Sequence, residues 1–360
     1  MAAILDLARW APSGDNAQPW SFCLTGPERA ILTVRDQSAT CLFERDGRCG
    51  LMSVGMLQEN IRIAASTVAR RIEWTRLGGG DRAPVFACTC PLDPYVVPDP
   101  LARWIMCRSV NRRTYATAEL GSAACDALRA GLSPGFTLRL AVGRERRRWA
   151  WMNQRAARIR LDTREGFDLT RRIIDWGVDV SEERIPDRAL GLPRIMLGIA
   201  RLQLSSWSMT SFANRWLGGT CLPRYLLEWR PGLACAAHVA VEADRMDDST
   251  DGWLRAGAAV QRFWLTATGL GLHHQPGMTP LIFARYVRDG IRFTDHAPAV
   301  AAAHEAADSL RHLLGPQALE RAVWLGRIGY AEPASARSIR LPLERLVDGY
   351  AAETEAPCAS

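Results

Sequence analysis

The stretch Ala11–Trp20 combines residues that break regular structure with residues that carry polar side chains. Pro12, Gly14 and Pro19 predict a tight loop after a helix expected over 3–10. The polar side chains of this loop are those of Ser13, Asn16 and Gln18. Such donors and acceptors suit the edge of a flat heterocycle with alternating carbonyl groups and ring nitrogens. The alternative is a capped turn that only joins a helix to a strand.

Arginines with small polar neighbours recur in two segments that lie far apart in the sequence. Arg108, Ser109 and Arg112 stand together in Arg108–Tyr115, and Arg337 and Arg340 stand near the C-terminus. A guanidinium group binds phosphate with two parallel hydrogen bonds, so each segment is a candidate phosphate clamp. The alternative is a solvated basic face, and the sequence does not show whether the two segments converge.

A third candidate is the stretch Gly269–Gly277, in which a helix is expected to end at a glycine and a turn to follow. Gln275, Pro276 and Gly277 would expose backbone groups to a ligand in that turn. His273 and His274 are adjacent and should face apart, so we expect no shared metal; acid or base chemistry by either one remains open.

The elements that position these segments repeat along the chain. Two helical patterns, Gly55–Val68 and Gly257–Leu270, share apolar residues at helical spacing, and the small residues of the second permit a close helix-helix approach. Four strands are expected, over 20–25, 84–90, 136–142 and 322–329. The sequence therefore predicts an α+β protein of two related halves.

The boundary between the halves is predicted near residue 100, where Pro98 and Pro100 mark a linker, so that the halves span 1–100 and 101–360. The second half carries an insertion over about 146–233 that begins with a charged amphipathic helix over 149–162. The aromatic and apolar middle of this insertion is interpreted as a lid over a pocket, or as a plain packing extension.

The composition narrows the classes of function. The net charge is +7 and all 45 basic residues are arginine, but they are dispersed and no nucleic-acid motif accompanies them. A nucleotide cofactor is therefore a better expectation than DNA or RNA. No Rossmann, phosphate-loop or hydrolase signature is present, which weighs against those enzymes.

Ten cysteines without zinc-ligand spacing and the lack of a leader-like N-terminus lead us to expect reduced thiols and a cytoplasmic protein without a metal. The most apolar window, Ile195–Leu227, is interrupted by Arg201, Arg215 and Arg224. We therefore expect no membrane span and no membrane partner.

Three segments together resemble the nitroreductase family of FMN flavoproteins. Leu7–Phe22 resembles the family's "APSG-x-N-x-QPW" segment, Gly257–Gly271 resembles its "Q-x-x-x-L-x-A-x-x-x-GLG" helix, and Val323–Arg340 resembles its final strand and following arginine. The first motif is fairly specific and the other two are weak. The resemblance implies a nitroreductase-like fold in which each half has an antiparallel-rich sheet flanked by helices.

By position, the resemblance assigns a flavin site. It implies that Arg108 and Arg112 match the two clamp arginines, while Val110 departs from the family's hydroxyl residue and Ser109 could substitute for it. It further implies loop contacts to the flavin ring and a C-terminal arginine for the phosphate. These matching positions are Pro12, Ser13, Gly14, Asn16 and Gln18 in the first loop, Gln275, Pro276 and Gly277 after the helix, and Arg337 or Arg340 at the end.

The order of the motifs differs from the usual family member, in which the clamp precedes the loop and two chains form two sites. Here the first half keeps the loop and lacks the clamp, and the second half keeps the clamp but has only Leu132–Phe136 in place of the loop. This arrangement resembles the fused pseudo-dimers of the Acg-like branch. It implies one FMN site between the halves and favours a monomer.

The leading hypothesis is an FMN-dependent oxidoreductase that takes hydride from NAD(P)H and acts on a small nitroaromatic, quinone or biosynthetic heterocycle. No side chain is assigned as catalytic, because the flavin carries the chemistry. A protein that stores or sequesters FMN without turnover is the first alternative, and an oxygen-dependent enzyme that modifies the flavin is the second.

Overall fold

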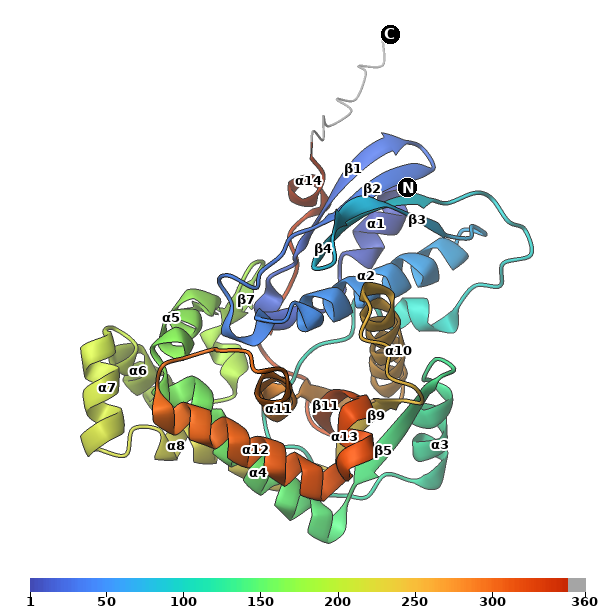
Figure 1. Cartoon of the computed structure of the whole chain (residues 1–360). Coiled ribbons are helices and arrows are strands. Elements are labelled where there is room, and N and C mark those ends of the chain that lie inside the picture. Colours follow the sequence, from blue (N-terminus) through green and yellow to red (C-terminus); the bar gives the residue numbers. More distant parts are fainter. Residues whose placement is uncertain (349–360) are drawn as a thin grey trace.

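The computed structural model describes residues 1–348 and contains two four-stranded antiparallel sheets (Figure 1). The first sheet has the strand order β1 (Trp20–Gly26), β2 (Arg29–Val34), β4 (Ala83–Thr89) and β3 (Glu73–Gly80). The second has the order β10 (His273–Pro276), β11 (Ala322–Gly329), β9 (Ala237–Ala243) and β5 (Phe136–Ala141). All four strands expected from the sequence are confirmed, as β1, β4, β5 and β11.

The prediction of a turn after the glycine-ended helix is wrong for His273–Pro276, because these residues form strand β10 and pair with β11. The pairing satisfies the backbone of a segment that reads as a turn in isolation. All strands up to Thr89 belong to the first sheet, and the second sheet starts at Phe136. The division of the chain near residue 100 stays a prediction.

Each sheet packs against a long helix, and these two helices pack against each other. They are α2 (Arg48–Ser66) and α10 (Thr250–Gly269), and they contain the two repeated segments. Glycine makes the crossing possible: a Cβ on Gly55 would lie 2.0 Å from the carbonyl oxygen of Leu254, and one on Gly257 would lie 2.1 Å from that of Met52. The close approach expected from Gly257 is therefore confirmed.

The insertion between β5 and β9 is helical and extends to one side of the molecule (Figure 1). Its first helix, α4 (Gly143–Asp162), contains the expected amphipathic helix and buries Trp149, Met152 and Ile159 on one face. The remaining elements are α5 (Arg164–Ile173), β6 (Ile174–Asp175), β7 (Val180–Ser181), β8 (Ile185–Pro186), the 3-10 helix η4 (Asp187–Leu190), α6 (Arg194–Gln203), α7 (Trp207–Trp216), α8 (Cys221–Arg224), the π-helical turn η5 (Tyr225–Trp229) and α9 (Arg230–Leu233).

The other α-helices are α1 (Ala2–Ala8), α3 (Ser122–Ala130), α11 (Thr279–Asp289), α12 (Ala297–Leu314), α13 (Pro316–Arg321) and α14 (Leu343–Leu346). α1 and α14 share the core of the first sheet with α2, α3 packs on α10, and α11, α12 and α13 pack on the face of the second sheet opposite α10. α12 packs along both α4 and α11 and so joins the insertion to the second half (Figure 1). Among residues 1–348, no helix has the length and apolar character that a membrane crossing would require.

The segment after β11 crosses from the second sheet to the first. It forms the short strand β12 (Arg337–Ser338) beside β7, and its Val347 then pairs in parallel with Phe22 of β1. The Asp348 amide donates a hydrogen bond of 2.7 Å to the Phe22 carbonyl. This crossing brings Arg337 and Arg340 to the loop that precedes β1.

The glycine crossing gives a test of how the halves are held together. Gly257→Ala places a methyl group against the Met52 backbone, which cannot move independently of its helix, so we expect a loss of about 1–3 kcal/mol in the free energy of unfolding. Gly198→Ala is the matched control, because Gly198 lies in α6 with open space around it and the change should be neutral or slightly stabilising. Equal urea denaturation curves for the two variants would contradict a tight crossing.

Candidate functional site

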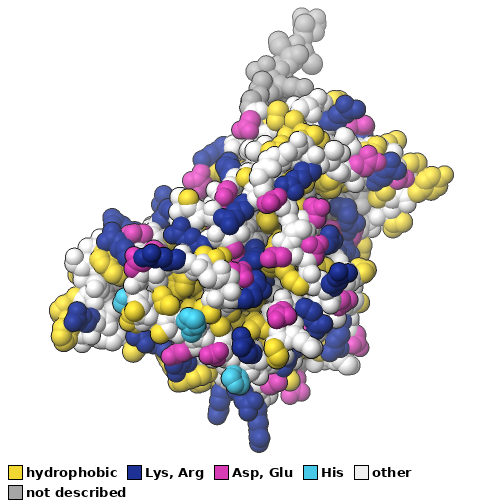
Figure 2. Space-filling view, in the orientation of Figure 1, with side chains coloured by type: hydrophobic (Ala, Val, Ile, Leu, Met, Phe, Trp, Pro, Cys, Tyr) yellow, Lys and Arg dark blue, Asp and Glu magenta, His cyan; other side chains and the backbone are white. Residues whose placement is uncertain are grey.

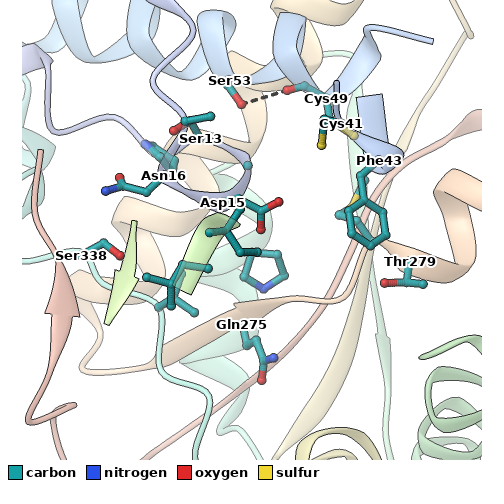
Figure 3. A pocket seen from close by; sticks show the side chains of 18 of the residues that line it. Ser13, Asp15, Asn16, Cys41, Phe43, Cys49, Ser53, Gln275, Thr279 and Ser338 are labelled. Carbon is teal, nitrogen blue, oxygen red and sulfur yellow. Dashed lines mark hydrogen bonds between the residues drawn. The ribbon is translucent and has the colours of Figure 1, made fainter. Parts of the chain in front are cut away.

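One cavity of about 650 Å³ brings together most of the residues that the sequence analysis selected. Its volume is in the usual range for a bound cofactor or substrate. Loop residues Ser13, Asp15 and Asn16 project from one side, and Gln275 projects from another (Figure 3). The selected residues that line it are Pro12, Ser13, Gly14, Asn16, Arg108, Ser109, Arg112, Gln275, Pro276, Gly277, Arg337 and Arg340.

The loop before β1 holds a strained backbone against this cavity. Asp15, Asn16 and Gln18 have φ values of 50°, 63° and 46°, in the left-handed region that side chains other than glycine rarely adopt. Asn16 is fixed by its Nδ2, which donates hydrogen bonds to the carbonyls of Glu182 at 2.8 Å and Ile339 at 3.1 Å, while its buried Oδ1 has no partner in the protein. Strain of this kind collects at functional sites, where the surrounding contacts maintain it.

Gln18 is the one selected residue that lies off the cavity. Its Nε2 donates to the carbonyls of Asn16 and Glu182, and its Oε1 accepts from the Leu341 amide at 2.9 Å. The side chain is 1% exposed and its amide is fully used by the backbone. The structure therefore gives Gln18 a positioning role: it ties the loop to the insertion and to the C-terminal segment.

The two arginine segments converge, but only in part. Arg108, Arg337 and Arg340 form a single group, which we call the arginine triad. Arg108 donates to the Trp10 carbonyl at 3.0 Å and its guanidinium carbon lies 4.6 Å from the centre of the Trp264 ring. Arg340 donates to the Ala11 carbonyl at 2.8 Å, so the triad is anchored directly before the strained loop.

The triad concentrates positive charge, with Arg108 and Arg340 buried and Arg337 half-buried. Burial and the neighbouring Arg340 and Arg337 hold the pKa of Arg108 well below its usual value, and burial with Arg337 lowers the pKa of Arg340 to about 9. Within residues 1–348, no carboxylate offsets the charge of any of the three, and the Nε atoms of Arg108 and Arg337 have no hydrogen-bond acceptor. A bound anion would balance the positive charge and also accept hydrogen bonds from these Nε atoms.

Arg112 belongs to a different group. Burial lowers the pKa of Arg112, Asp15 opposes this shift, and Arg160 adds to it. Arg108 and Arg112 both line the cavity, but the charged neighbours of Arg108 are Arg340 and Arg337, whereas those of Arg112 include Asp15 and Arg160. Between them, Val110 forms a parallel bridge with His274, which places the clamp segment along strand β10.

Strand β10 orients Gln275 toward the cavity. Arg327 of β11 donates from Nε to Oε1 of Gln275 at 2.8 Å, which leaves the Nε2 of Gln275 as the free donor. Gln275 therefore offers its Nε2 to a ligand as a hydrogen-bond donor, because the hydrogen bond from Arg327 fixes the orientation of its amide group.

His274 does not act as an acid or base. It is fully buried, accepts at Nε2 from the Trp324 indole at 3.0 Å, and donates from Nδ1 to the Arg327 carbonyl at 3.0 Å. Burial lowers its pKa to about 3, so the ring is neutral. His273 is half-buried on the other face of the strand, as the expectation that the two would face apart requires, and burial also lowers its pKa.

The far end of the cavity carries carboxyl and thiol groups that the sequence analysis did not select. Glu44 is 4% exposed, and its Oε2 accepts from the Gly50 amide at 2.8 Å. Burial raises the pKa of Glu44 to about 8, and the nearby Asp46 and Asp15 add to the shift. Cys41 and Cys49 lie close to each other at this end (Figure 3), and Glu44 is an ionisable neighbour of both. Burial raises the pKa of both thiols, that of Cys41 to about 12.

The insertion forms one wall of the cavity. Asn153 and Arg160 of α4, Arg172 of α5 and Glu228 of η5 line it. Burial raises the pKa of Glu228 against the opposing charge of Arg160, which lies 3.9 Å away. Isolated π-helical turns are frequent at functional sites, and this one places a carboxyl group in the cavity wall. No group of three potential metal ligands was found among residues 1–348.

Comparison with known proteins assigns the chain to no family. No family model and no curated protein matches the chain. One matching solved structure is the FMN-dependent nitroreductase NfnB from Mycobacterium smegmatis in complex with NADPH, with 16% sequence identity, coverage of 69% of this chain and 97% of that one, and a TM-score of 0.36. Similarity at that score carries no argument about fold or activity.

The arginine triad predicts anion-dependent stability. Added inorganic phosphate should stabilise the protein by about 1.4 kcal/mol at ten times its dissociation constant, or about 2–4 °C in the melting temperature. Arg108→Met should remove most of this gain. Arg48→Met is the control, because Arg48 is paired with Asp46, Asp248 and Asp289 away from the cavity, so the variant should lose stability but keep the phosphate response. Equal phosphate shifts in all three proteins, at constant ionic strength, would contradict an anion site at the triad.

Glu44 predicts a pH dependence with a defined sign. Because its pKa is about 8 in the folded protein and near 4.5 when exposed, the folded state holds a proton that the unfolded state has lost between these values. Its contribution to stability is therefore complete below pH 4.5 and is lost as the pH rises toward 8, by at most about 1.4 kcal/mol per pH unit. Glu44→Gln should flatten the decline in unfolding free energy between pH 5 and 8, and Glu119→Gln, at an exposed site, should not. Parallel pH curves for wild type and Glu44→Gln would exclude a protonated Glu44.

Proposed function

We propose that the chain binds one FMN in this cavity and acts as an FMN-dependent oxidoreductase. The observation that carries the proposal is the arginine triad: among the described residues, the buried Arg108 and Arg340 and the half-buried Arg337 have no carboxylate partner, and they lie beside a strained polar loop and a cavity of about 650 Å³. A cofactor with a phosphate at one end and a flat polar heterocycle at the other matches this combination.

The triad would hold the phosphate. Arg108 and Arg337 each have an unpartnered Nε, and Arg340 is held in place by the Ala11 and Ile339 carbonyls. Ser109 also lines the cavity there and would supply a hydroxyl in place of the one that Val110 lacks. Arg112 would act elsewhere, because Asp15 and Arg160 are its neighbours.

The ring would lie between the loop and strand β10. The Nε2 of Gln275 is a free donor and the Oδ1 of Asn16 is a buried acceptor without a partner, so the site presents one of each to a heterocycle edge. When bound, the flavin supplies the hydride chemistry, and this chain's residues orient it and shield it from water. NAD(P)H is the reductant proposed, and the substrate class is a nitroaromatic, a quinone or a biosynthetic heterocycle.

We further propose that the chain is a fused pseudo-dimer with one site, as in the Acg-like branch. The loop comes from the segment before the first sheet, whereas the triad and Gln275 come from later segments, so the cavity needs both halves. The crossing of the C-terminal segment to β1 supports the same division. A single chain would then be sufficient for activity.

Storage or sequestration of FMN is the second candidate. It is favoured by the wall that α4, α5 and η5 build over the cavity, since a closed wall would keep substrates from the ring. Reduction by a nicotinamide cofactor separates the two functions, because a storage protein has no need to admit it.

The test is to record the visible spectrum of the purified protein after reconstitution with FMN, and to measure the flavin released per chain. We expect one FMN per chain and rapid anaerobic bleaching by NADH or NADPH. Arg340→Gln should weaken FMN binding about 10-fold or more, and Arg129→Gln, at an exposed ion pair, should leave it unchanged. One bound FMN without bleaching would favour storage. Two FMN per chain would exclude the single-site proposal, and no binding at all would exclude the function.

A further inference from the structure

Helices α6 and α7 turn their apolar stripes outward. On α6, Ile195, Ile199 and Leu202 are 78%, 49% and 60% exposed, and on α7, Met209, Phe212 and Trp216 are 43%, 58% and 67% exposed. The spacing in both helices is that of a single helix face. Such a stripe normally faces the core, so two neighbouring helices with the stripe in solvent indicate a surface with an external partner.

The same surface continues into the next turns of the chain. Leu217, Leu222 and Tyr225 are 72%, 47% and 49% exposed. The opposite sides of the helices hold the hairpin to the body, with Leu197 and Thr210 buried. We call the surface formed by the nine exposed residues the α6–α7 patch. Its members are Ile195, Ile199, Leu202, Met209, Phe212, Trp216, Leu217, Leu222 and Tyr225.

The charge within the chain segment that forms the patch has one sign. Residues 188–227 contain five arginines and neither aspartate nor glutamate. Arg194, Arg201 and Arg215 are exposed beside the two stripes. In Figure 2, hydrophobic and arginine atoms lie together at the left edge of the molecule, where Figure 1 places α6 and α7.

This chemistry favours a lipid surface over a protein. Helices with arginines beside an apolar face that includes Trp and Phe lie in the boundary between headgroups and acyl chains, and anionic lipids attract the arginines. A second copy of the same face would bring like charges together, which disfavours self-association. The hairpin is also at the periphery of the molecule, so it can meet a planar surface first (Figure 1).

We infer that the α6–α7 patch docks this protein onto the surface of a membrane that contains anionic phospholipid. Docking of this kind needs no spanning helix, so it revises the expectation of no membrane partner while leaving the absence of a candidate span unaffected. Ala189 and Glu228, which stand just before and just after the patch in the chain, line the cavity. The lipid surface would therefore contact the segment that forms the cavity wall.

The experiment is co-sedimentation of the full chain with large vesicles, either of phosphatidylcholine alone or with about one third phosphatidylglycerol. We expect binding to the anionic vesicles that is at least about 5-fold stronger than to the neutral ones and that weakens as salt is raised. Ile195→Ser, Phe212→Ser and Trp216→Ser combined should abolish it. Tyr95→Ser with Val97→Ser is the matched control, because both residues are more than 80% exposed outside the patch, and it should bind as the wild type does.

A second variant tests the charge separately. Arg194→Gln, Arg201→Gln and Arg215→Gln combined should remove the preference for anionic vesicles and leave the melting temperature unchanged. Vesicle binding that the serine variant does not reduce, or no binding to either vesicle, would overturn the inference. A wild-type dimer in light scattering that the serine variant converts to a monomer, without vesicle binding, would instead assign the patch to contacts between copies.

Discussion

The approach of the α2 and α10 backbones is the constraint on which the rest of the molecule depends. Gly55 faces the Leu254 carbonyl and Gly257 faces the Met52 carbonyl, so the helices touch through main chain at these two points, and the buried Gln261 Nε2 donates to Asn60 Oδ1 further along the same contact. This contact fixes the distance between the two sheets, because each sheet packs on one of the two helices. The cavity residues Ser53 and Met56 of α2 and Trp264 of α10 are therefore held at a spacing that the crossing sets.

Around these two helices, burial leaves some ionisable groups neutral while others stay charged. His238 and His274 are neutral, because burial lowers the pKa of each to about 3. Glu44 is also neutral below about pH 8. The arginines of the triad do not become neutral, since a guanidinium group stays protonated under ordinary conditions. Among the described residues, the triad has no carboxylate beside it, whereas Arg112 and Arg160 elsewhere in the cavity lie near Asp15, so a ligand with a single anionic end would be favoured with that end at the triad.

Much of the fold was accessible from the sequence, because local patterns determine local elements. Helical spacing is sufficient to predict α2 and α10, and Gly257 to predict a close helix-helix approach, but the sequence does not show that α2 is the partner of α10. Strand β10 was missed, since His-Gln-Pro-Gly reads as a turn until β11 is present to pair with it. The composition of 195–227 likewise showed its apolar character, but composition does not tell which way an apolar stripe faces.

Less of the site than of the fold could be predicted from the sequence. The residue types of the loop and of the two arginine segments marked the cavity wall, because guanidinium and amide groups are informative wherever they lie. Glu44 and Asp15 gave no such signal, since their chemistry comes from burial beside residues distant in the chain. For the same reason the sequence did not show that Gln18 is a positioning residue. Its amide is used by Glu182 and Leu341, which lie more than 160 residues away in the chain.

The crossing of the C-terminal segment also sets an order of assembly during synthesis. Arg340 leaves the ribosome roughly 230 residues after Arg108, which at 5–20 residues per second is a delay of roughly 10–50 s. The first sheet and the α2–α10 contact can form in that interval, whereas strand β11 of the second sheet ends at Gly329, shortly before Arg340. The second sheet and the arginine triad are therefore completed together, after the crossing of the two helices.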